Sequence, residues 1–316
     1  MELVTLDAIR RAAKHLAGVV VRTPLLSFPA EDGLWLKPEN LQPVGAFKLR
    51  GAYNAVACLP DSVRARGVLT HSSGNHGQAL AYAARAFGVP CVVVMPDVAP
   101  AVKVAATRAS GAEIVFVPPA DRTRVAEALA TERGMTVVPP YDHRDVIAGQ
   151  GTVGLEIVED MPDVDVVLVP VGGGGLASGV ATAVKALRPA ARVIGVEPEL
   201  AADAKESLAA GRLLTWPVER SYRTMADGVR VNLSELTFAH LRERLDAVVT
   251  VSEQEIASAV GRLVRGGRIV VEPSGAVAAA ARLFHRAELP AGRTVAVVSG
   301  GNIDPVVLAE LVAADD

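Results

Sequence analysis

Four consecutive glycines, Gly172 to Gly175, stand between an apolar run and a helical pattern that continues to Leu187. The apolar run Val167–Val171 is typical of a buried parallel strand. Interior glycines cost roughly 0.5–1 kcal/mol each in backbone entropy, so four in a row indicate that a ligand must approach the backbone closely. The usual ligand is a phosphate, held by free N–H groups at the positive end of a helix. The pattern therefore predicts a phosphate-binding loop, with a flexible loop as the alternative.

The residues after the glycines restrict the kind of phosphate ligand. Leu176 and Ala177 stand where a nucleotide-hydrolysing loop needs lysine and serine or threonine. The dinucleotide fingerprint fits better, because Gly172-x-Gly174-x-x-Ala177 nearly matches it and Glu197 ends the next apolar strand. These residues alone do not exclude a dinucleotide-binding protein.

A second residue with possible chemistry is Lys48, which lies between Phe47 and Leu49 at the start of a helical run. Partial desolvation would lower the pKa of this amine and make it a nucleophile that can form a Schiff base. Taken alone, the same stretch is typical of an ordinary surface lysine at a helix start.

Two loops with small and polar residues follow predicted strands. In His71–Gln78, a row of polar and glycine residues exceeds what one helix cap requires, and free N–H groups there suit a carboxylate. The loop Ser299–Asn302 follows the last strong strand and is equally typical of a simple turn.

Composition excludes several classes of protein. The chain has 316 residues, half of them hydrophobic, which predicts a large core and two domains. Its net charge of −3 without a basic tract argues against nucleic-acid binding, and no apolar segment has the roughly 18 residues of a membrane helix. Residues 1–17 resemble an amphipathic helix rather than a signal peptide, and Cys58 and Cys91 have neither metal nor redox spacing. We therefore expect a reduced, cytoplasmic protein with neither a nucleic-acid nor a membrane partner.

Strand-like runs alternate with helical patterns from about Leu34 onward, which predicts an α/β fold with mostly parallel strands covered by helices on both faces. We expect a small domain at 53–146, inserted into a large domain formed by 1–52 and 147–316. A ligand would then lie between them, near the carboxyl ends of the strands. The predicted strands are Leu34–Lys37, Gly67–Thr70, Cys91–Met95, Glu113–Val117, Thr136–Val138, Val166–Val171, Val193–Val196, Ala247–Val251 and Thr294–Val298. The predicted helices include His76–Phe87, Pro100–Ser110, Arg122–Arg133, Gly175–Leu187, Glu253–Arg265 and Gly275–Arg286.

Four stretches together resemble the serine/threonine dehydratase and serine racemase family: Gly45–Gly51, Ser72–Gly77, Gly172–Gly175 and Ser299–Asn302. Members of this family are pyridoxal-phosphate enzymes of the tryptophan-synthase-β fold (fold type II), with two open, mostly parallel sheets and a small domain inserted in a large one. The resemblance runs from about residue 22 to residue 304, with the motifs in the expected order. It displaces the dinucleotide interpretation, which explains only the glycines and Glu197.

The resemblance implies roles for individual residues. Lys48 would hold pyridoxal phosphate as a Schiff base and move the Cα proton, and Ser73 would be the acid/base on the opposite face. A hydroxyl at Ser299, facing the pyridine nitrogen, would make the ring a weaker electron sink than a carboxylate would, which favours β-elimination over transamination. The implied cofactor contacts are Phe47, Lys48, Asn75, Gly172, Gly173, Gly174, Gly175 and Ser299. The implied substrate-carboxylate loop comprises Ser72, Ser73, Asn75 and His76.

The stretch Glu197–Asp203 resembles the divalent-cation site of the racemase-like branch of the family. The ligands implied are Glu197, Asp203 and the Ala201 carbonyl, and all-oxygen ligation suits Mg²⁺ or Ca²⁺. The alternative is a pair of acids at a strand–helix junction, one of them acting as a cap. Pro43 and Val44 depart from many relatives near their nucleotide site, which argues against activation by ATP.

These features predict a pyridoxal-phosphate-dependent L-serine/L-threonine ammonia-lyase that eliminates the β-hydroxyl and releases a 2-oxo acid and ammonia. The alternatives are a serine racemase and a dehydratase of another β-hydroxy amino acid, such as 3-hydroxyaspartate. The substrate would be a small amino acid, and the resemblance implies a homodimer.

Overall fold

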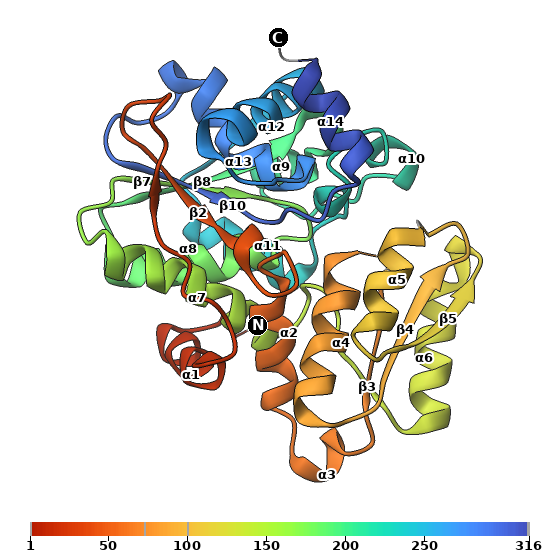
Figure 1. Cartoon of the computed structure of the whole chain (residues 1–316). Coiled ribbons are helices and arrows are strands. Elements are labelled where there is room, and N and C mark those ends of the chain that lie inside the picture. The colour runs from red at the N-terminus through yellow and green to blue at the C-terminus, as the bar shows by residue number, and fades with distance from the viewer. Residues whose placement is uncertain (1, 73, 100, 315–316) are drawn as a thin grey trace.

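Two sheets organise the chain, as the computed structural model shows for residues 2–72, 74–99 and 101–314 (Figure 1). The six-stranded sheet has the order β1-β2-β10-β7-β8-β9, and the four-stranded sheet has the order β5-β4-β3-β6. We call the six-stranded sheet with its helices the large unit, and the four-stranded sheet with its helices the small unit. This arrangement confirms the predicted α/β fold with two mostly parallel sheets. In the described residues, no helix is long and apolar enough to cross a membrane.

All neighbouring strands are parallel except β1 and β2. The two residues of β1 are too few to show a period in the sequence, and no prediction covers them. The pairing of β7 with β8 places the strand before the glycines beside the strand that ends near Glu197. The strands of the large unit are β1 (Leu26–Ser27), β2 (Leu34–Pro38), β7 (Val166–Pro170), β8 (Arg192–Pro198), β9 (Ala247–Val251) and β10 (Thr294–Val298). Those of the small unit are β3 (Val68–His71), β4 (Cys91–Pro96), β5 (Glu113–Val117) and β6 (Thr136–Val137).

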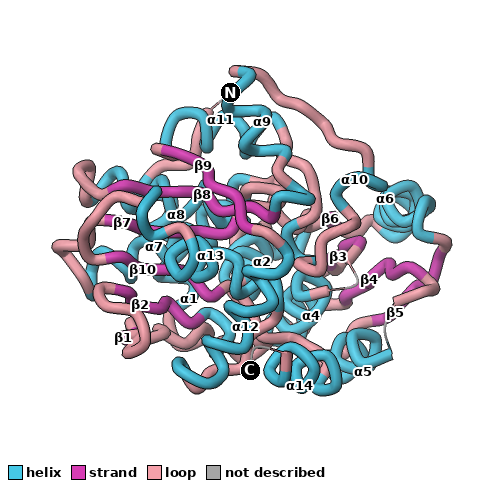
Figure 2. The backbone as a smooth tube through the Cα atoms, turned by 90° about the horizontal axis from the view of Figure 1, so that it is seen from above, coloured by secondary structure: helices cyan, strands magenta, loops and turns pink. Residues whose placement is uncertain are grey.

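Helices cover both faces of the large sheet (Figure 1), and Figure 2 shows the strands of this sheet side by side. The α-helices are α1 (Leu6–Leu16), α2 (Lys48–Ala57), α3 (Asp61–Arg64), α4 (Asn75–Phe87), α5 (Ala101–Ala109), α6 (Arg122–Arg133), α7 (Arg144–Asp160), α8 (Gly175–Leu187), α9 (Asp203–Ala210), α10 (Val218–Ser221), α11 (Glu235–Arg244), α12 (Glu253–Gly267), α13 (Pro273–Phe284) and α14 (Pro305–Ala313). Short 3₁₀ turns are η1 (Glu39–Leu41), η2 (Pro119–Asp121), η3 (Glu199–Ala201), η4 (Asp227–Val229) and η5 (Arg286–Glu288). Two residues of predicted features, Ser73 and Pro100, lie outside the described residues.

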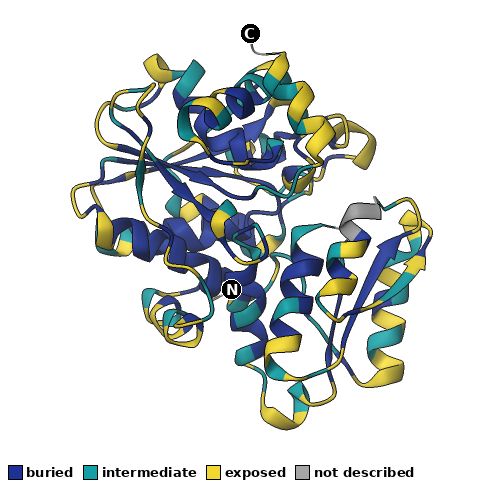
Figure 3. Cartoon of the chain, viewed as in Figure 1, coloured by how far each residue is buried: buried dark blue, intermediate teal, exposed yellow. Residues whose placement is uncertain are grey.

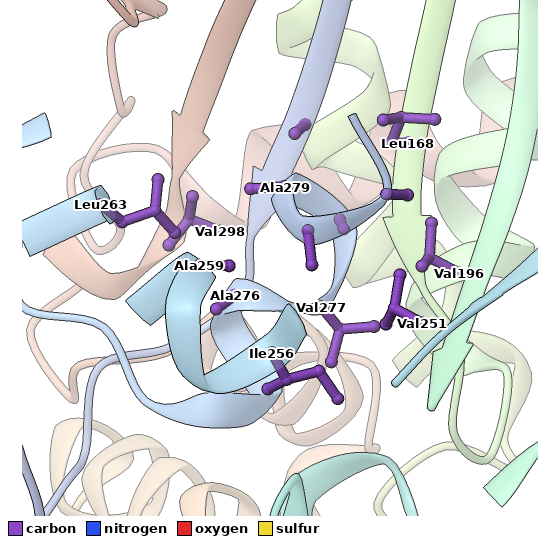
Figure 4. Packing of buried hydrophobic residues seen from close by; sticks show 14 of the residues in the cluster. Leu168, Val196, Val251, Ile256, Ala259, Leu263, Ala276, Val277, Ala279 and Val298 are labelled. Atoms are coloured by element: carbon purple, nitrogen blue, oxygen red, sulfur yellow. The ribbon is translucent and has the colours of Figure 1, made fainter. Parts of the chain in front are cut away.

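The core of the large unit follows from the alternation of side chains along β7. Val166 and Leu168 pack in one buried cluster with α12 and α13, whereas Val167 and Val169 pack in another with α7 and α8. Successive side chains of a strand point to opposite faces, so a continuous apolar run fills two cores. Figure 4 shows the first of these clusters, in which Val277 of α13 packs beside Val251 of β9.

The helix α2 connects the two units, because it packs against α7 of the large unit and α4 of the small unit. The predicted domain boundaries fall inside helices, the first within α2 and the second within α7. Burial is continuous along these helices, while the outer faces of the small unit are exposed (Figure 3). The exact extent of the two domains stays a prediction.

Candidate active site

A cavity of about 310 Å³ lies where residues of the two units meet. Pro170 at the end of β7, Ser299 after β10 and His71 at the end of β3 line it, as expected for a ligand site at the carboxyl ends of parallel strands. It brings together all the described cofactor and substrate residues of the sequence prediction. These are Phe47, Lys48, Ser72, Asn75, His76, Gly172, Gly173, Gly174, Gly175 and Ser299. The predicted acid/base Ser73 lies outside the described residues.

Lys48 is the first residue of α2, and its amine lines the cavity. Its Nζ donates to the carbonyl oxygen of Pro140 at 2.9 Å and lies 5.1 Å from the centroid of the Phe47 ring. In the described part of the chain no carboxylate pairs with this amine. Burial lowers the pKa of Lys48 to about 8, which leaves part of the amine uncharged and nucleophilic near neutral pH.

A buried ion network anchors the helix that carries Lys48. Arg50 donates from Nε and Nη2 to the two carboxylate oxygens of Glu39, at 2.7 and 2.8 Å. It also donates from Nη1 and Nη2 to Glu156, at 2.6 and 2.9 Å. Lys37 completes the network with a 2.6 Å bond to Glu156, and all four charged side chains are buried. These bidentate contacts tie α2 to β2, η1 and α7, and so fix where the amine of Lys48 can lie.

The glycine loop between β7 and α8 provides free backbone donors. Within the described residues, none of the N–H groups from Gly172 to Gly175 donates to another protein group. Gly174 has a φ of 82°, where a side chain would be strained, and a Cβ at Gly173 would lie 2.4 Å from the ring of Tyr141. The loop therefore places unbonded backbone N–H groups along the cavity, at the positive end of α8. Such an arrangement binds phosphate.

A second set of backbone donors lies at the start of α4. Gly74 is the N-cap of this helix and makes no side-chain cap bond, while Ser72 Oγ accepts from its N–H at 3.3 Å. His76 is buried, and its Nε2 donates to the carbonyl oxygen of Val138 at 2.9 Å. Burial and the nearby Lys48 lower the pKa of His76 to about 3. A carboxylate at this helix end would thus meet backbone N–H groups rather than an imidazolium.

The side chain of Asn75 is held at both ends. Its Nδ2 donates to Glu272 Oε1 at 2.7 Å, and its Oδ1 accepts from Asn302 Nδ2 at 2.8 Å. These bonds join the first turn of α4 to the start of α13 and to the loop after β10. Sequence reasoning missed Glu272, although an acid directly before Pro273 at a helix start was a usable signal.

Ser299 closes the cavity at the end of β10. Its Oγ donates to the carbonyl oxygen of Ser274 at 3.2 Å, and its own carbonyl oxygen accepts from the N–H of Phe47 at 3.1 Å. The hydroxyl is buried and lines the cavity. The strand end therefore also fixes the residue that precedes Lys48.

The acids predicted to bind a cation lie together at the junction of β8 and α9. Glu197 accepts from the N–H groups of Ala204 and Lys205 at 3.0 and 2.8 Å, and Asp203 accepts from the N–H of Leu233 at 3.0 Å. Burial raises the pKa of both carboxyls, that of Asp203 to about 6, and the nearby Asp203 raises that of Glu197 further. Glu197 therefore accepts hydrogen bonds from two N–H groups in the first turn of α9. In the described residues no cluster of three or more His, Cys, Asp or Glu could hold a metal.

Other cavity residues had no role in the sequence prediction. The ring of Tyr141 packs on the glycine loop. Tyr141 follows two prolines after β6, which indicate a loop, but the sequence prediction gave this loop no role. Arg122 and Arg230 carry no local signal at all, because their approach depends on how the two units fold together.

The chain matches the family described as "Pyridoxal-phosphate dependent enzyme" over residues 16–300. It belongs to this family. An L-threo-3-hydroxyaspartate ammonia-lyase of Saccharomyces cerevisiae is 41% identical over 98% of this chain and 95% of its own length. An L-threonine ammonia-lyase of Thermotoga maritima is 42% identical over 96% of this chain and 76% of its own length.

Solved structures give the same family and confirm fold type II. Maize serine racemase superposes with a TM-score of 0.93 at 37% identity, covering 99% of this chain and 98% of its own. A threonine deaminase of T.th. superposes with a TM-score of 0.90 at 47% identity, covering 95% of this chain and 99% of its own. The predicted family, the fold and a pyridoxal-phosphate-dependent ammonia-lyase or racemase chemistry are thereby confirmed.

The residues present fit the cofactor. The amine of Lys48 has no carboxylate partner among the described residues, and the glycine N–H groups leave their donor capacity unused. Both sets of groups line the same cavity, together with the hydroxyl of Ser299. The glycine N–H groups therefore suit the phosphate of the cofactor, the Lys48 amine suits its aldehyde carbon, and the Ser299 hydroxyl suits its ring nitrogen.

Proposed function

We propose that this protein is an ammonia-lyase of L-β-hydroxy amino acids, L-serine and L-threonine among them, with racemisation as a side activity. The observation that carries the proposal is the meeting of a desolvated Lys48 amine, a free glycine cradle and a serine hydroxyl in one cavity. A hydroxyl at Ser299 in place of a carboxylate favours elimination over transamination.

The protein groups would divide the work as follows. When bound, pyridoxal phosphate supplies a Schiff-base linkage and a sink for the electrons left behind at Cα. Gly172–Gly175 would hold its phosphate, Ser299 and Asn75 would contact its ring, and Phe47 would pack beside it. The neutral amine of Lys48 would remove the Cα proton, which starts the loss of the β-hydroxyl.

The substrate α-carboxylate would lie at the N-terminus of α4. Ser72, Asn75 and His76 would present backbone N–H groups there, and the neutral imidazole of His76 would add no charge. Ser73 would act as the acid/base on the face opposite Lys48, which is what racemisation requires.

Relatives support both alternatives to a serine/threonine dehydratase. One relative is named L-threo-3-hydroxyaspartate ammonia-lyase, and serine racemases of Oryza sativa and Schizosaccharomyces pombe are 39% and 38% identical. A substrate with a second carboxylate would bind in the same cavity, and reprotonation of Cα would take place there as well.

The first expected result is the release of 2-oxo acid and ammonia in equal amounts when the purified protein, saturated with pyridoxal phosphate, meets its substrate. A panel of L-serine, L-threonine, D-serine and L-threo-3-hydroxyaspartate, followed by a coupled assay for each 2-oxo acid, measures this. Chiral chromatography of the residual amino acid reports racemisation. Absence of 2-oxo acid from all four amino acids would reject the ammonia-lyase proposal.

We also propose that Glu197, Asp203 and the Ala201 carbonyl bind Mg²⁺ or Ca²⁺. The residues fit a cation, because both carboxylates are buried and the nearby Asp203 raises the pKa of Glu197. Lys205 donates its backbone N–H to Glu197, and its Nζ donates to Thr250. A hard cation with oxygen ligands would relieve the repulsion between the two carboxylates.

If the cation binds, EDTA should lower the melting temperature and Mg²⁺ or Ca²⁺ should restore it. A ligand of the native state adds about 2.7 kcal/mol of stability at a hundredfold excess over its Kd. Asp203→Ala should lose the response to metal, whereas Glu206→Gln, on the exposed side of the same helix, should keep it. An identical response of wild type and Asp203→Ala in differential scanning fluorimetry would contradict the site.

A homodimer and a cytoplasmic location complete the proposal. Exposed apolar side chains on α14 and beside it suit a contact with a second copy, among them Val306, Val307 and Val270. Cys58 and Cys91 are both free, which agrees with a reducing compartment.

A further inference from the structure

Two guanidinium groups line the cavity and have no role in the elimination of a hydroxyl from serine or threonine. Arg122 begins α6 of the small unit, and Arg230 follows η4 of the large unit. The two side chains thus reach one cavity from opposite units.

Neither arginine is neutralised by a carboxylate of the part of the chain that the structure describes. Arg122 donates from Nε to the carbonyl oxygen of Pro119 at 3.0 Å, and this bond leaves both Nη groups available. Arg230 stacks on Tyr222, with Cζ 4.0 Å from the ring centroid. Within the described residues no carboxylate lies within 4.0 Å of either guanidinium. Stacking fixes the plane of the Arg230 guanidinium and leaves its N–H edge for a ligand.

The other ionisable groups of the cavity do not offset this positive charge. The carboxylates that line it are Asp227 and Glu272, and both already interact with other groups of the protein, Glu272 with Asn75. Burial, together with Arg122, lowers the pKa of His71, and His76 is neutral as well. The unused charges that face a substrate are therefore cationic.

The α-carboxylate of a substrate has its own site at the N-terminus of α4, so the arginines are left for a second anionic group. Serine and threonine carry hydrogen or methyl at the β-carbon, which a guanidinium cannot bind. A β-carboxylate, in contrast, forms bidentate charge-assisted bonds with arginine.

We infer that Arg122 and Arg230 bind the β-carboxylate of a 3-hydroxyaspartate substrate, and that this dicarboxylate is preferred over L-serine and L-threonine. The inference rests on the proposed ammonia-lyase function of the same cavity. Loss of the Cα proton and the β-hydroxyl releases one water, and hydrolysis of the resulting enamine consumes one water. The net products are oxaloacetate and ammonia, without oxidant or reductant.

The test compares Arg122→Gln and Arg230→Gln with two matched controls. Arg124→Gln removes an exposed arginine two residues further along α6, and Arg223→Gln removes an exposed arginine beside Tyr222. Wild type should have a higher kcat/KM for L-threo-3-hydroxyaspartate than for L-serine. Each cavity variant should lower kcat/KM for the dicarboxylate by roughly 10- to 100-fold and change that for L-serine by less than about 3-fold. Both controls should match wild type for both substrates.

Binding of succinate, a dicarboxylate without a reacting group, gives a readout that does not depend on turnover. Isothermal titration of the cofactor-loaded protein should show weaker succinate binding in both cavity variants and unchanged binding in both controls. Arg230→Lys, which keeps the charge, should recover part of the affinity if Arg230→Gln loses it.

Equal losses for L-serine and L-threo-3-hydroxyaspartate, or succinate binding that no variant changes, would overturn the inference. The same result would leave the ammonia-lyase proposal intact. If wild type instead releases no 2-oxo acid from any substrate, the proposed function fails, and the succinate titration still decides whether the arginines form a dicarboxylate site.

Discussion

The Lys48→Ala variant is expected to lose on the order of 10³- to 10⁴-fold or more in kcat/KM, because in the proposed mechanism one amine is both the Schiff-base nucleophile and the base that moves the Cα proton. The substrate panel measures the rate. Borohydride reduction followed by peptide mapping measures whether pyridoxal phosphate is fixed to the peptide that contains residue 48. Wild type should carry the reduced cofactor there, and the variant should carry none.

The variant should remain folded, since the hydrogen bond to Pro140 is the one polar contact of the Lys48 amine in the described residues. Its far-UV circular dichroism should match that of wild type. Lys14→Ala, on the exposed face of α1, is the matched control and should keep both turnover and cofactor attachment. Turnover near the wild-type rate in Lys48→Ala would remove this lysine from the chemistry.

Strand positions could be predicted because local pattern and tertiary environment agree. Val166–Pro170 is apolar throughout, and the structure buries both of its faces. The helix α7 shows the opposite case. Gly149, Gly151 and Gly154 lower its intrinsic helix propensity, and none of the predicted ranges covers it.

The glycines of α7 are explained only by packing between helices. A Cβ at Gly149 would lie 2.4 Å from the carbonyl oxygen of Arg50 in α2, and one at Gly154 would lie 2.7 Å from the carbonyl oxygen of Val180 in α8. Close approach of three helices therefore requires small residues that local propensity disfavours. The contacts that explain these glycines are not visible in the local sequence pattern.

The same distinction separates the site residues. Lys48 and Gly172–Gly175 occur in short contiguous motifs, so their chemistry is visible in the sequence itself. Arg122 and Arg230 stand on different units and meet at the cavity only when the chain has folded. Residues of one contiguous motif are thus easier to predict as cavity residues than residues that only the folded chain brings together.

Replacing one charged side chain of the buried ion network behind Lys48 should lower the free energy of unfolding more than replacing a charged side chain at the surface. Glu156→Gln is expected to lower the free energy of unfolding by about 3–5 kcal/mol, because it leaves the buried Arg50 and Lys37 facing one carboxylate instead of two. Chemical unfolding followed by circular dichroism measures the loss. Activity should fall as well, since α2 is the helix that places the Lys48 amine.

The helix α7, which carries Glu156, also carries the control residue. Glu159 lies one turn away on α7 and pairs with Arg22 at the surface, so Glu159→Gln should cost no more than about 1 kcal/mol. Adding Lys37→Met to Glu156→Gln removes the excess positive charge, and this double variant should recover part of the loss. Equal small effects of Glu156→Gln and Glu159→Gln would show that water reaches the network. Failure of Lys37→Met to recover any stability would show that the lost hydrogen bonds, rather than the unbalanced charge, cause the destabilisation.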